Sequence, residues 1–177
     1  AKKTGDNYHM SNSLNSLGNA YNTKGQLGIA LTLFLEALEY AGAANDNNKI
    51  ARINNNIGIV YYNQDDMDKA LDHFQTTANI LINEGDTLGA IFAFNNIGGI
   101  YNHQEKQAEA LAYFERGYKL SLLLDHKLAI SVLLTGVATV HNDIALARTK
   151  IYTSNRALAT TSSVVLLRHI DKTPLKI

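Results

Sequence analysis

Asparagine is the residue type whose placement first suggests chemistry in this chain. The sequence contains 19 asparagines, and four of them near the beginning are separated by three, four and three residues: Asn12, Asn15, Asn19 and Asn22. On a helix, this spacing places all four side chains on one face. A carboxamide can accept from the N–H of a peptide unit and donate to its C=O, whatever the neighbouring side chain is. The row therefore predicts a surface that binds polypeptide backbone.

A second group of asparagines lies in the middle of an expected helix, where asparagine does not stabilise the helix. Asn54, Asn55 and Asn56 are consecutive, and asparagine costs up to about 0.7 kcal/mol relative to alanine inside a helix. The three together cost about 2 kcal/mol on that scale. We therefore expect a compensating contact or a function for them.

The sequence shows no motif for catalysis or for binding a metal or a cofactor. The chain has no cysteine, which excludes disulfides and thiolate zinc sites. It shows no zinc-binding His-Glu-x-x-His helix, no phosphate-binding glycine loop and no dinucleotide fingerprint. The acidic run 65–68 resembles part of a calcium loop but lacks its glycine and its final glutamate, so helix capping explains it better. We expect no catalysis, no metal and no cofactor.

Composition narrows the partners and the location. The chain has 16 Lys plus Arg and 16 Asp plus Glu, and this balance argues against nucleic acid or an anionic membrane surface, which both reward a basic excess. The chain has no run of eighteen apolar residues, so no membrane span is expected, and its start has no signal-peptide pattern. These features favour a cytoplasmic setting. The missing initiator methionine indicates a piece of a longer protein or a processed one.

The chain repeats itself every 40 residues. The recurring columns, named by their residues in the first unit, are Leu17, Gly18, Tyr21, Ala30 and Phe34. Turn residues recur in the same register at 5–6, 45–46, 85–86 and 125–126. Because a fixed period of this length is the signature of stacked helical units, the repeat predicts an all-α solenoid.

Each unit is predicted to be a pair of antiparallel helices. The first helix, helix A, is expected over 7–23, 47–63 and 87–103, with Asp6, Asp46 and Asp86 as N-caps. The second, helix B, is expected over 26–43, 66–83 and 106–123. The glycine and alanine columns let the two helices approach, and the tyrosine and phenylalanine rings fill the space between hairpins. One hairpin cannot cover its own apolar face, so the units must stack.

The two ends match the repeat less well. Residues 1–6 are interpreted as the tail of an earlier helix B. A degenerate fourth unit is expected over 127–157: its helix A places Leu134, Val137 and Ala138 in the repeat columns, and Ala147 and Ile151 fill the helix B columns if about three residues are deleted from the turn. Residues 158–177 fit no column, and the polar run 160–163 is interpreted as a break.

The columns resemble the tetratricopeptide repeat. Its sequence of a large residue, leucine-glycine, tyrosine, alanine, phenylalanine and alanine is matched in the first unit by Leu14, Leu17, Gly18, Tyr21, Ala30, Phe34 and Ala37. The later units depart at Asn54, Thr77 and Gly117, and the usual closing proline is missing throughout. The 40-residue spacing is similar to the long-helix variety of kinesin light chains, Pins-type adaptors and bacterial peptide sensors. The resemblance covers residues 11–123 and implies a right-handed superhelix.

The resemblance also implies a binding groove, because helix A of this family forms the concave wall. Ten of the eighteen family groove positions are asparagine here, against nine of the other 159 residues. The residues assigned to a peptide-binding groove on this basis are Asn12, Asn15, Asn19, Asn22, Arg52, Asn55, Asn56, Tyr62, Asn63, Phe92, Asn95, Asn96, Asn102 and His103. Asn56 and Asn96 occupy the family position that contacts peptide main chain, where the first unit has Ser16 instead.

Simpler explanations compete at several of these positions. Asn22, Asn63 and Asn102 lie near helix ends, where C-capping alone accounts for asparagine. Asn54 lies at a hairpin-packing position and is open to a bond with a neighbouring helix. His103 is either a solvated histidine or a pH-sensitive groove residue.

The predicted ligand is a neutral, partly hydrophobic protein or peptide segment. Family members that clamp C-terminal carboxylates need cations at groove positions that are Asn15, Asn19, Asn55, Ile59, Asn95 and Gly99 here. Arg52 is the one firm cation assigned to the wall. The leading hypothesis is a non-catalytic binding scaffold. The alternative is a sensory or oligomerisation segment of a larger signalling protein that self-associates through its C-terminal part.

Overall fold

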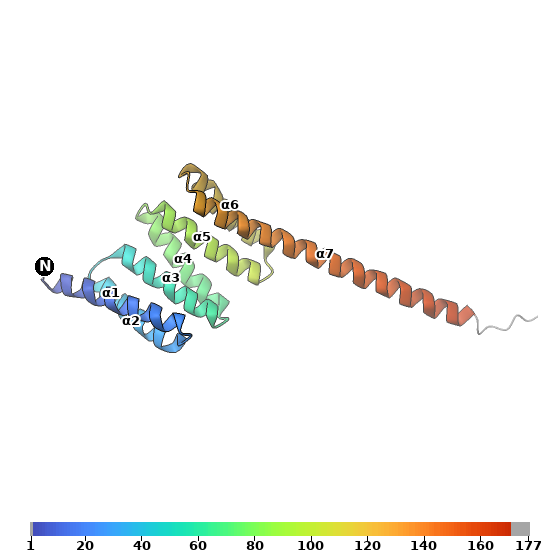
Figure 1. Ribbon diagram of the computed structural model, residues 1–177, viewed down its shortest axis with the longest axis horizontal. Coiled ribbons are helices and arrows are strands. Elements are labelled where there is room, and N and C mark those ends of the chain that lie inside the picture. Colours follow the sequence, from blue (N-terminus) through green and yellow to red (C-terminus); the bar gives the residue numbers. More distant parts are fainter. Residues whose placement is uncertain (1, 171–177) are drawn as a thin grey trace, which may run out of the picture. The chain divides into compact units, whose positions relative to one another are not determined.

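The fold is all-α. The computed structural model describes residues 2–170, with side chains over 6–151. The helices are α1 (Lys2–Thr23), α2 (Leu27–Ala43), α3 (Asn47–Asn63), α4 (Met67–Asn83), α5 (Thr87–His103), α6 (Gln107–Leu123) and α7 (Lys127–Ile170). Consecutive helices from α1 to α6 form antiparallel hairpins that lie side by side (Figure 1). The bounds of α2 to α6 agree with the predicted ranges within one residue.

The turns between helices recur every twenty residues and share one backbone conformation. The second residue after the end of each helix from α1 to α6 has a positive φ, from 48° at Asp125 to 75° at Gly25, and the six positions are Gly25, Asn45, Asp65, Gly85, Glu105 and Asp125. The N–H one residue further on donates back across the turn, as Gln26 does to the carbonyl of Tyr21 at 2.9 Å. This is the left-handed C-terminal cap that ends many helices.

Aspartates begin three of the helices. Asp46 caps α3, Asp66 caps α4 and Asp86 caps α5, each by accepting from the backbone N–H three residues later. The predicted cap at Asp6 is wrong, since α1 begins at Lys2 and Asp6 lies inside it. The helix continues through Gly5 without a turn.

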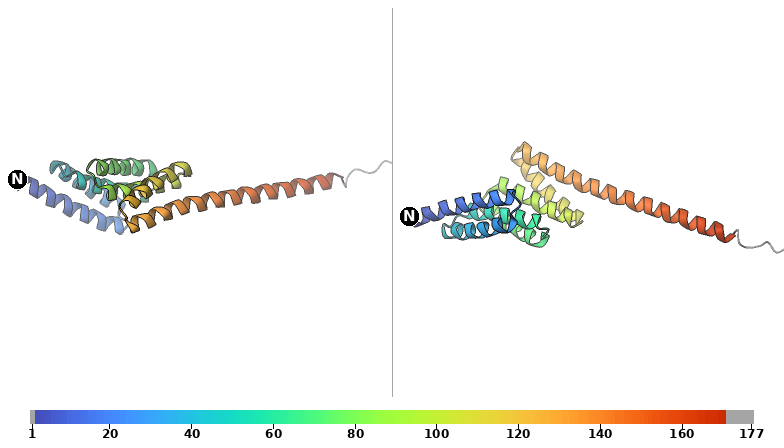
Figure 2. Two further views of the ribbon diagram at one scale, coloured as in Figure 1. Left: turned by 90° about the horizontal axis from the view of Figure 1, so that it is seen from above. Right: turned by 60° about the horizontal axis from the view of Figure 1, so that its bottom comes forward.

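The core of each hairpin is a phenylalanine ring in a notch left by glycine. A Cβ atom added at Gly18 would lie 2.6 Å from the Phe34 ring, and one added at Gly58 would lie 2.8 Å from the Phe74 ring. Phe114 contacts Gly98 in the same way. These rings are buried, with Ala30, Ala70 and Ala110 beside them at 0% exposure. The predicted packing is confirmed, and two further views show the hairpins in layers (Figure 2).

The chain divides into two compact units, residues 1–137 and 138–177. The compact unit of residues 1–137 includes the beginning of α7, which packs on α6. There, Ala129 and Leu133 are fully buried, and Leu133 fills the space beside Gly117. Of the residues predicted for the columns of a fourth helix A, Val137 is half-buried and Ala138 is exposed. Leu134, which would face a helix B, is 47% exposed instead.

The predicted fourth hairpin and the break at 160–163 are wrong within the described residues. α7 is one continuous helix of 44 residues. The place of the expected turn holds Ile144, Ala145 and Leu146, which are not helix-stopping residues. Nothing is described for residues 171–177, the last part of the predicted tail.

Within the described residues, one segment, Lys127–Ile151, is long and apolar enough to cross a membrane by length and composition alone. The segment contains no uninterrupted run of eighteen apolar residues, because Lys127, Asp143, Arg148 and Lys150 lie within it. A core helix of a soluble protein can pass the same test.

Candidate functional site: a carboxamide face on α1, α3 and α5

Consecutive A helices are joined by side-chain bonds between asparagines. Asn56 Nδ2 donates to Asn15 Oδ1 at 2.9 Å, linking α3 to α1. Asn96 Nδ2 donates to Asn55 Oδ1 at 3.0 Å, linking α5 to α3. A longer bond of 3.4 Å runs from Asn63 to Asn22. We call these bonds rungs, and the side of α1, α3 and α5 that carries them the carboxamide face.

The rungs join residues 41 apart, one more than the repeat length. A residue on one A helix therefore meets the residue one position further along the next A helix. The same step brings the ring of His103 to 6.2 Å from the ring of Tyr62. Arg52 Nη2 reaches Asn12 Oδ1 at 3.5 Å, with a step of 40.

The structure brings most of the predicted site residues together. Asn12, Asn15 and Asn22 on α1, Arg52, Asn55, Asn56, Tyr62 and Asn63 on α3, and Asn96 and His103 on α5 all take part in these contacts. Asn102 lies half-buried on α5, and Asn19 is exposed on α1. Asn95 is half-buried, and the residue 41 positions further on is Gly136, which cannot form a rung. Phe92 packs edge-on against His126 at 6.4 Å.

Each rung uses only part of the hydrogen-bonding capacity of its two amides. Among the described residues, the bond from Asn96 to Asn55 leaves the Nδ2 of Asn55 and the Oδ1 of Asn96 without a protein side-chain partner. One N–H and one oxygen are the two groups that a peptide unit needs from a partner. Asn55 and Asn96 are half-buried, so a bond made there is partly shielded from water.

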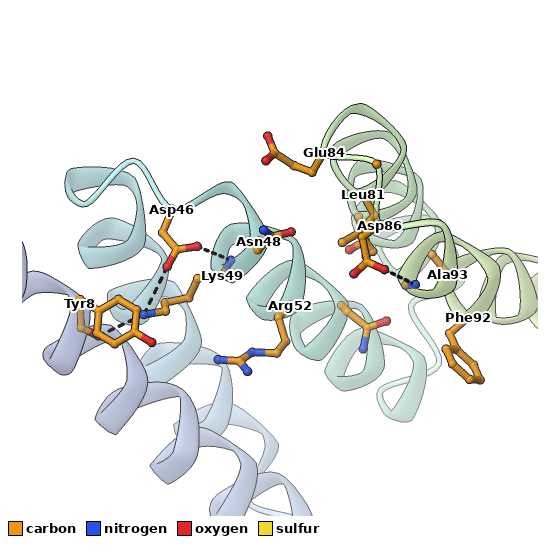
Figure 3. A pocket seen from close by; sticks show the side chains of 14 residues that line it. Tyr8, Asp46, Asn48, Lys49, Arg52, Leu81, Glu84, Asp86, Phe92 and Ala93 are labelled. Carbon is orange, nitrogen blue, oxygen red and sulfur yellow. Dashed lines mark hydrogen bonds and ion pairs between the residues drawn. The ribbon is translucent and has the colours of Figure 1, made fainter. Parts of the chain in front are cut away.

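A cleft of about 740 Å³ opens beside this face, between the first turns of α3 and α5 and the end of α4. One wall is built around Lys49, which is only 3% exposed. Its ammonium lies 3.1 Å from the centre of the Tyr8 ring, donates to the Tyr8 carbonyl at 3.2 Å and pairs with Asp46 at 3.5 Å (Figure 3). The charge of Lys49 is thus satisfied within the protein.

The opposite side of the cleft is acidic and apolar. Asp86 and Glu84 line it together with Leu81 and Phe92, and Arg52 projects from α3 (Figure 3). Asp86 already caps α5, and Glu84 accepts from the Asn47 amide at 2.8 Å. The cleft can therefore hold a small polar group beside an apolar one.

Sequence reasoning missed the cleft, although one signal was present. Lys49 stands in a repeat column that holds His9, Gly89 and Ala129 in the other units. A lone lysine in a column that is otherwise uncharged or weakly basic indicates a local partner. The partner, Tyr8, is 41 residues away and cannot be identified from the repeat columns alone.

Asn54 is not part of the carboxamide face. Its Oδ1 lies 2.9 Å from Nδ1 of His73 on α4, and its Nδ2 donates to the carbonyl of Ile50. The His73 ring also stacks on Tyr61, and burial lowers the pKa of the His73 imidazole. The expectation that Asn54 bonds to a neighbouring helix is confirmed.

The fold and this face together define a class of protein: an α-solenoid of helical hairpins that presents one helix of each hairpin on a common polar surface. Family models described as tetratricopeptide repeat match residues 11–44 and 49–122. The chain belongs to the tetratricopeptide repeat family, which supports a role as a protein–protein interaction scaffold. No curated protein matches it in sequence.

Solved structures of low sequence identity share the fold. Aspartyl phosphate phosphatase F from Bacillus subtilis has a TM-score of 0.73 at 14% identity, over 87% of this chain and 40% of that one. The Rap conjugation gene regulator of plasmid pLS20, in complex with the Phr* peptide, has a TM-score of 0.65 at 18% identity, over 80% and 40%. The N-terminal domain of stress-induced protein-1 from C. elegans has a TM-score of 0.61 at 15% identity, over 80% and 98%. This chain thus spans less than half the length of the first two structures.

Proposed function

We propose that this protein is a non-catalytic scaffold that binds a peptide or protein segment along the carboxamide face. The observation that carries the proposal is the row of rungs, of which the Asn96–Asn55 pair keeps one N–H and one oxygen without a side-chain partner among the described residues. Repeated at successive hairpins, these groups offer a bound chain several points at which one of its peptide units can bind. Backbone recognition of this kind explains why the face is rich in asparagine rather than in charged residues.

The chemistry of the ligand follows from the surroundings of the rungs. Arg52 stands across the cleft from Glu84 and Asp86, and Lys49 is paired with Asp46, so charges of both signs line the cleft and their sum is one negative charge. Phe92 and Leu81 add apolar area. We infer a neutral, partly hydrophobic segment, bound by hydrogen bonds and apolar contact with little electrostatic steering.

We also propose a cytoplasmic location and no membrane insertion. The first part of the apolar segment Lys127–Ile151 is covered by protein, because Ala129 and Leu133 are fully buried. This burial supports a solenoid helix over a lipid-facing one at the beginning of the segment, while 17% of its apolar window as a whole is buried. The balanced charge of the chain likewise supports a protein partner over nucleic acid.

The test removes one rung amide from the second repeat, Asn56, and one from the third repeat, Asn96. Short peptides selected from a phage-displayed random library on the parent protein serve as probes. The double variant Asn56→Ala with Asn96→Ala should bind them about 1–3 kcal/mol more weakly, because buried peptide groups then lose their partners. Isothermal titration calorimetry measures the loss, and circular dichroism should show unchanged helicity.

A matched control makes the same chemical change elsewhere. Asn79 and Asn83 are exposed on α4, away from the carboxamide face, and Asn79→Ala with Asn83→Ala should bind like the parent. In a ¹H–¹⁵N spectrum, the side-chain amide signals of Asn55 and Asn96 should shift on titration with peptide, while those of Asn79 and Asn83 stay in place. Equal affinities for the two double variants would refute the assignment of the face.

A second candidate function is a sensory or oligomerisation segment of a larger signalling protein. The observation that favours it is the apolar surface of α7, where Leu128, Leu146 and Ile151 are more than half exposed. Both roles are compatible, because they use different helices.

A further inference from the structure

The apolar residues of α7 follow a seven-residue pattern that continues past the part covered by α6. Leu133, Val137 and Val140 are separated by four and three residues, and Ile144, Ala147 and Ile151 continue the same alternation. In the sequence, the next two places of the pattern are serine at 154 and leucine at 158. Apolar residues at alternating steps of three and four, here from Leu133 to Ile151, are the signature of a coiled-coil seam.

Burial changes along this one seam. Leu133 and Val140 are fully buried, whereas Ile144 is half-buried, Ala147 is exposed and Ile151 is 60% exposed. The stripe that packs against protein at the beginning of the helix therefore lies uncovered further along it. Apolar side chains that lie uncovered in a regular stripe are costly in water, so a partner of matching shape stabilises them.

We propose that the segment of α7 from Ile144 onward pairs with the same segment of a second copy of this chain, as a parallel two-stranded coiled coil. The first core position of each heptad, position a, is Val137, Ile144 or Ile151, and β-branched residues there favour two parallel strands. The other core position, position d, is Leu133, Val140 or Ala147. This self-association is independent of peptide binding by the carboxamide face.

The charges that flank the seam support the parallel orientation. Asp143 occupies the g position before Ile144, and Arg148 occupies the e position of the next heptad. In a parallel pair, each g residue faces the e residue five places further along the other strand. Asp143 of one copy thus faces Arg148 of the other, twice in the dimer by symmetry.

Cysteine cross-linking tests both the contact and its direction, because the chain has no cysteine of its own. In a parallel pair the two Ala147 residues face each other, so Ala147→Cys should form a covalent dimer under mild oxidation. Leu146→Cys changes a neighbouring residue that is 51% exposed and lies off the seam, and it should stay mostly monomeric on a non-reducing gel. Equal cross-linking of the two variants, or none at position 147, would overturn the proposal.

Sedimentation of the full chain supplies the second measurement. The parent should be a dimer without detergent, and Ile151→Ala should raise the dimer dissociation constant about a hundredfold, since both copies lose a core side chain. Arg148→Glu should weaken the dimer by like-charge repulsion, and adding Asp143→Arg should restore it. A parent that stays monomeric, or that associates only with phosphatidylcholine vesicles, would contradict the coiled coil.

Discussion

The apolar layer between the helices repeats more regularly from hairpin to hairpin than the carboxamide face on their surface does. In the layer, the same phenylalanine meets the same glycine in three hairpins, at Phe34, Phe74 and Phe114. On the face, the rungs lengthen from 2.9 Å at Asn56 to 3.4 Å at Asn63, and Asn95 has no rung to Gly136. The difference indicates that the layer constrains its residues more tightly than the face does.

The largest expected effect comes from the layer. Phe74→Ala removes a buried ring that no neighbour can replace, and it should lower the free energy of unfolding by about 3–5 kcal/mol. Urea denaturation measures the change. Tyr62→Ala is the matched control on the carboxamide face, because Tyr62 is 43% exposed, and its cost should stay below about 1 kcal/mol. Similar losses in both variants would abolish the distinction between layer and face.

Alanine substitutions at two glycines should change the free energy of unfolding by smaller amounts and in opposite directions, which sharpens the comparison. Gly58→Ala places a Cβ 2.8 Å from the Phe74 ring and should destabilise the fold by about 1–3 kcal/mol through overpacking. Gly99→Ala on α5 meets nothing within 4 Å and should stabilise it by about 0.5–1 kcal/mol through helix propensity. Thermal melts of the two variants should move in opposite directions. A gain at Gly58 would show that the ring has room to withdraw.

The layer was predictable from the sequence, and the face only in part, for a physical reason. A notch for Phe74 requires glycine at a fixed distance along the chain, so the column repeats and can be recognised. The rungs depend on how one hairpin is rotated against the next, which shifts the contact from 40 to 41 residues, as between Asn15 and Asn56. That rotation results from packing along the whole helix, and no single residue encodes it.

The end of the solenoid was predicted less well because two signals compete there. The helix A pattern continues into α7, where Leu133 is buried like Ile53 and Ala93, the residues 80 and 40 positions before it. The turn after it depends on residues that stop a helix, and Ile144, Ala145 and Leu146 do not. The repeat pattern predicted a hairpin, whereas local helix propensity produced the continuous α7.

A stabilising change tests whether the layer and the face are separable. Lys106 begins α6 without a side-chain cap, while Asp66 at the same place in α4 accepts from the N–H of Lys69. Lys106→Asp should therefore add about 1 kcal/mol to the free energy of unfolding. Peptide affinity should not change, since Lys106 lies outside the carboxamide face. A higher melting temperature accompanied by altered binding would show that stability and recognition are coupled through the hairpins.

The smallest expected effects compare two rungs. Asn56→Ala leaves the oxygen of Asn15, a residue only 6% exposed, without its donor, and this should cost about 1 kcal/mol. Asn63→Ala removes a 3.4 Å bond between exposed groups and should cost less than about 0.5 kcal/mol. Chemical denaturation of both variants under the same conditions resolves the difference. If the exposed rung cost as much as the buried one, the asparagines would serve mainly to fix each hairpin against the next, and a ligand would not be needed to explain their number.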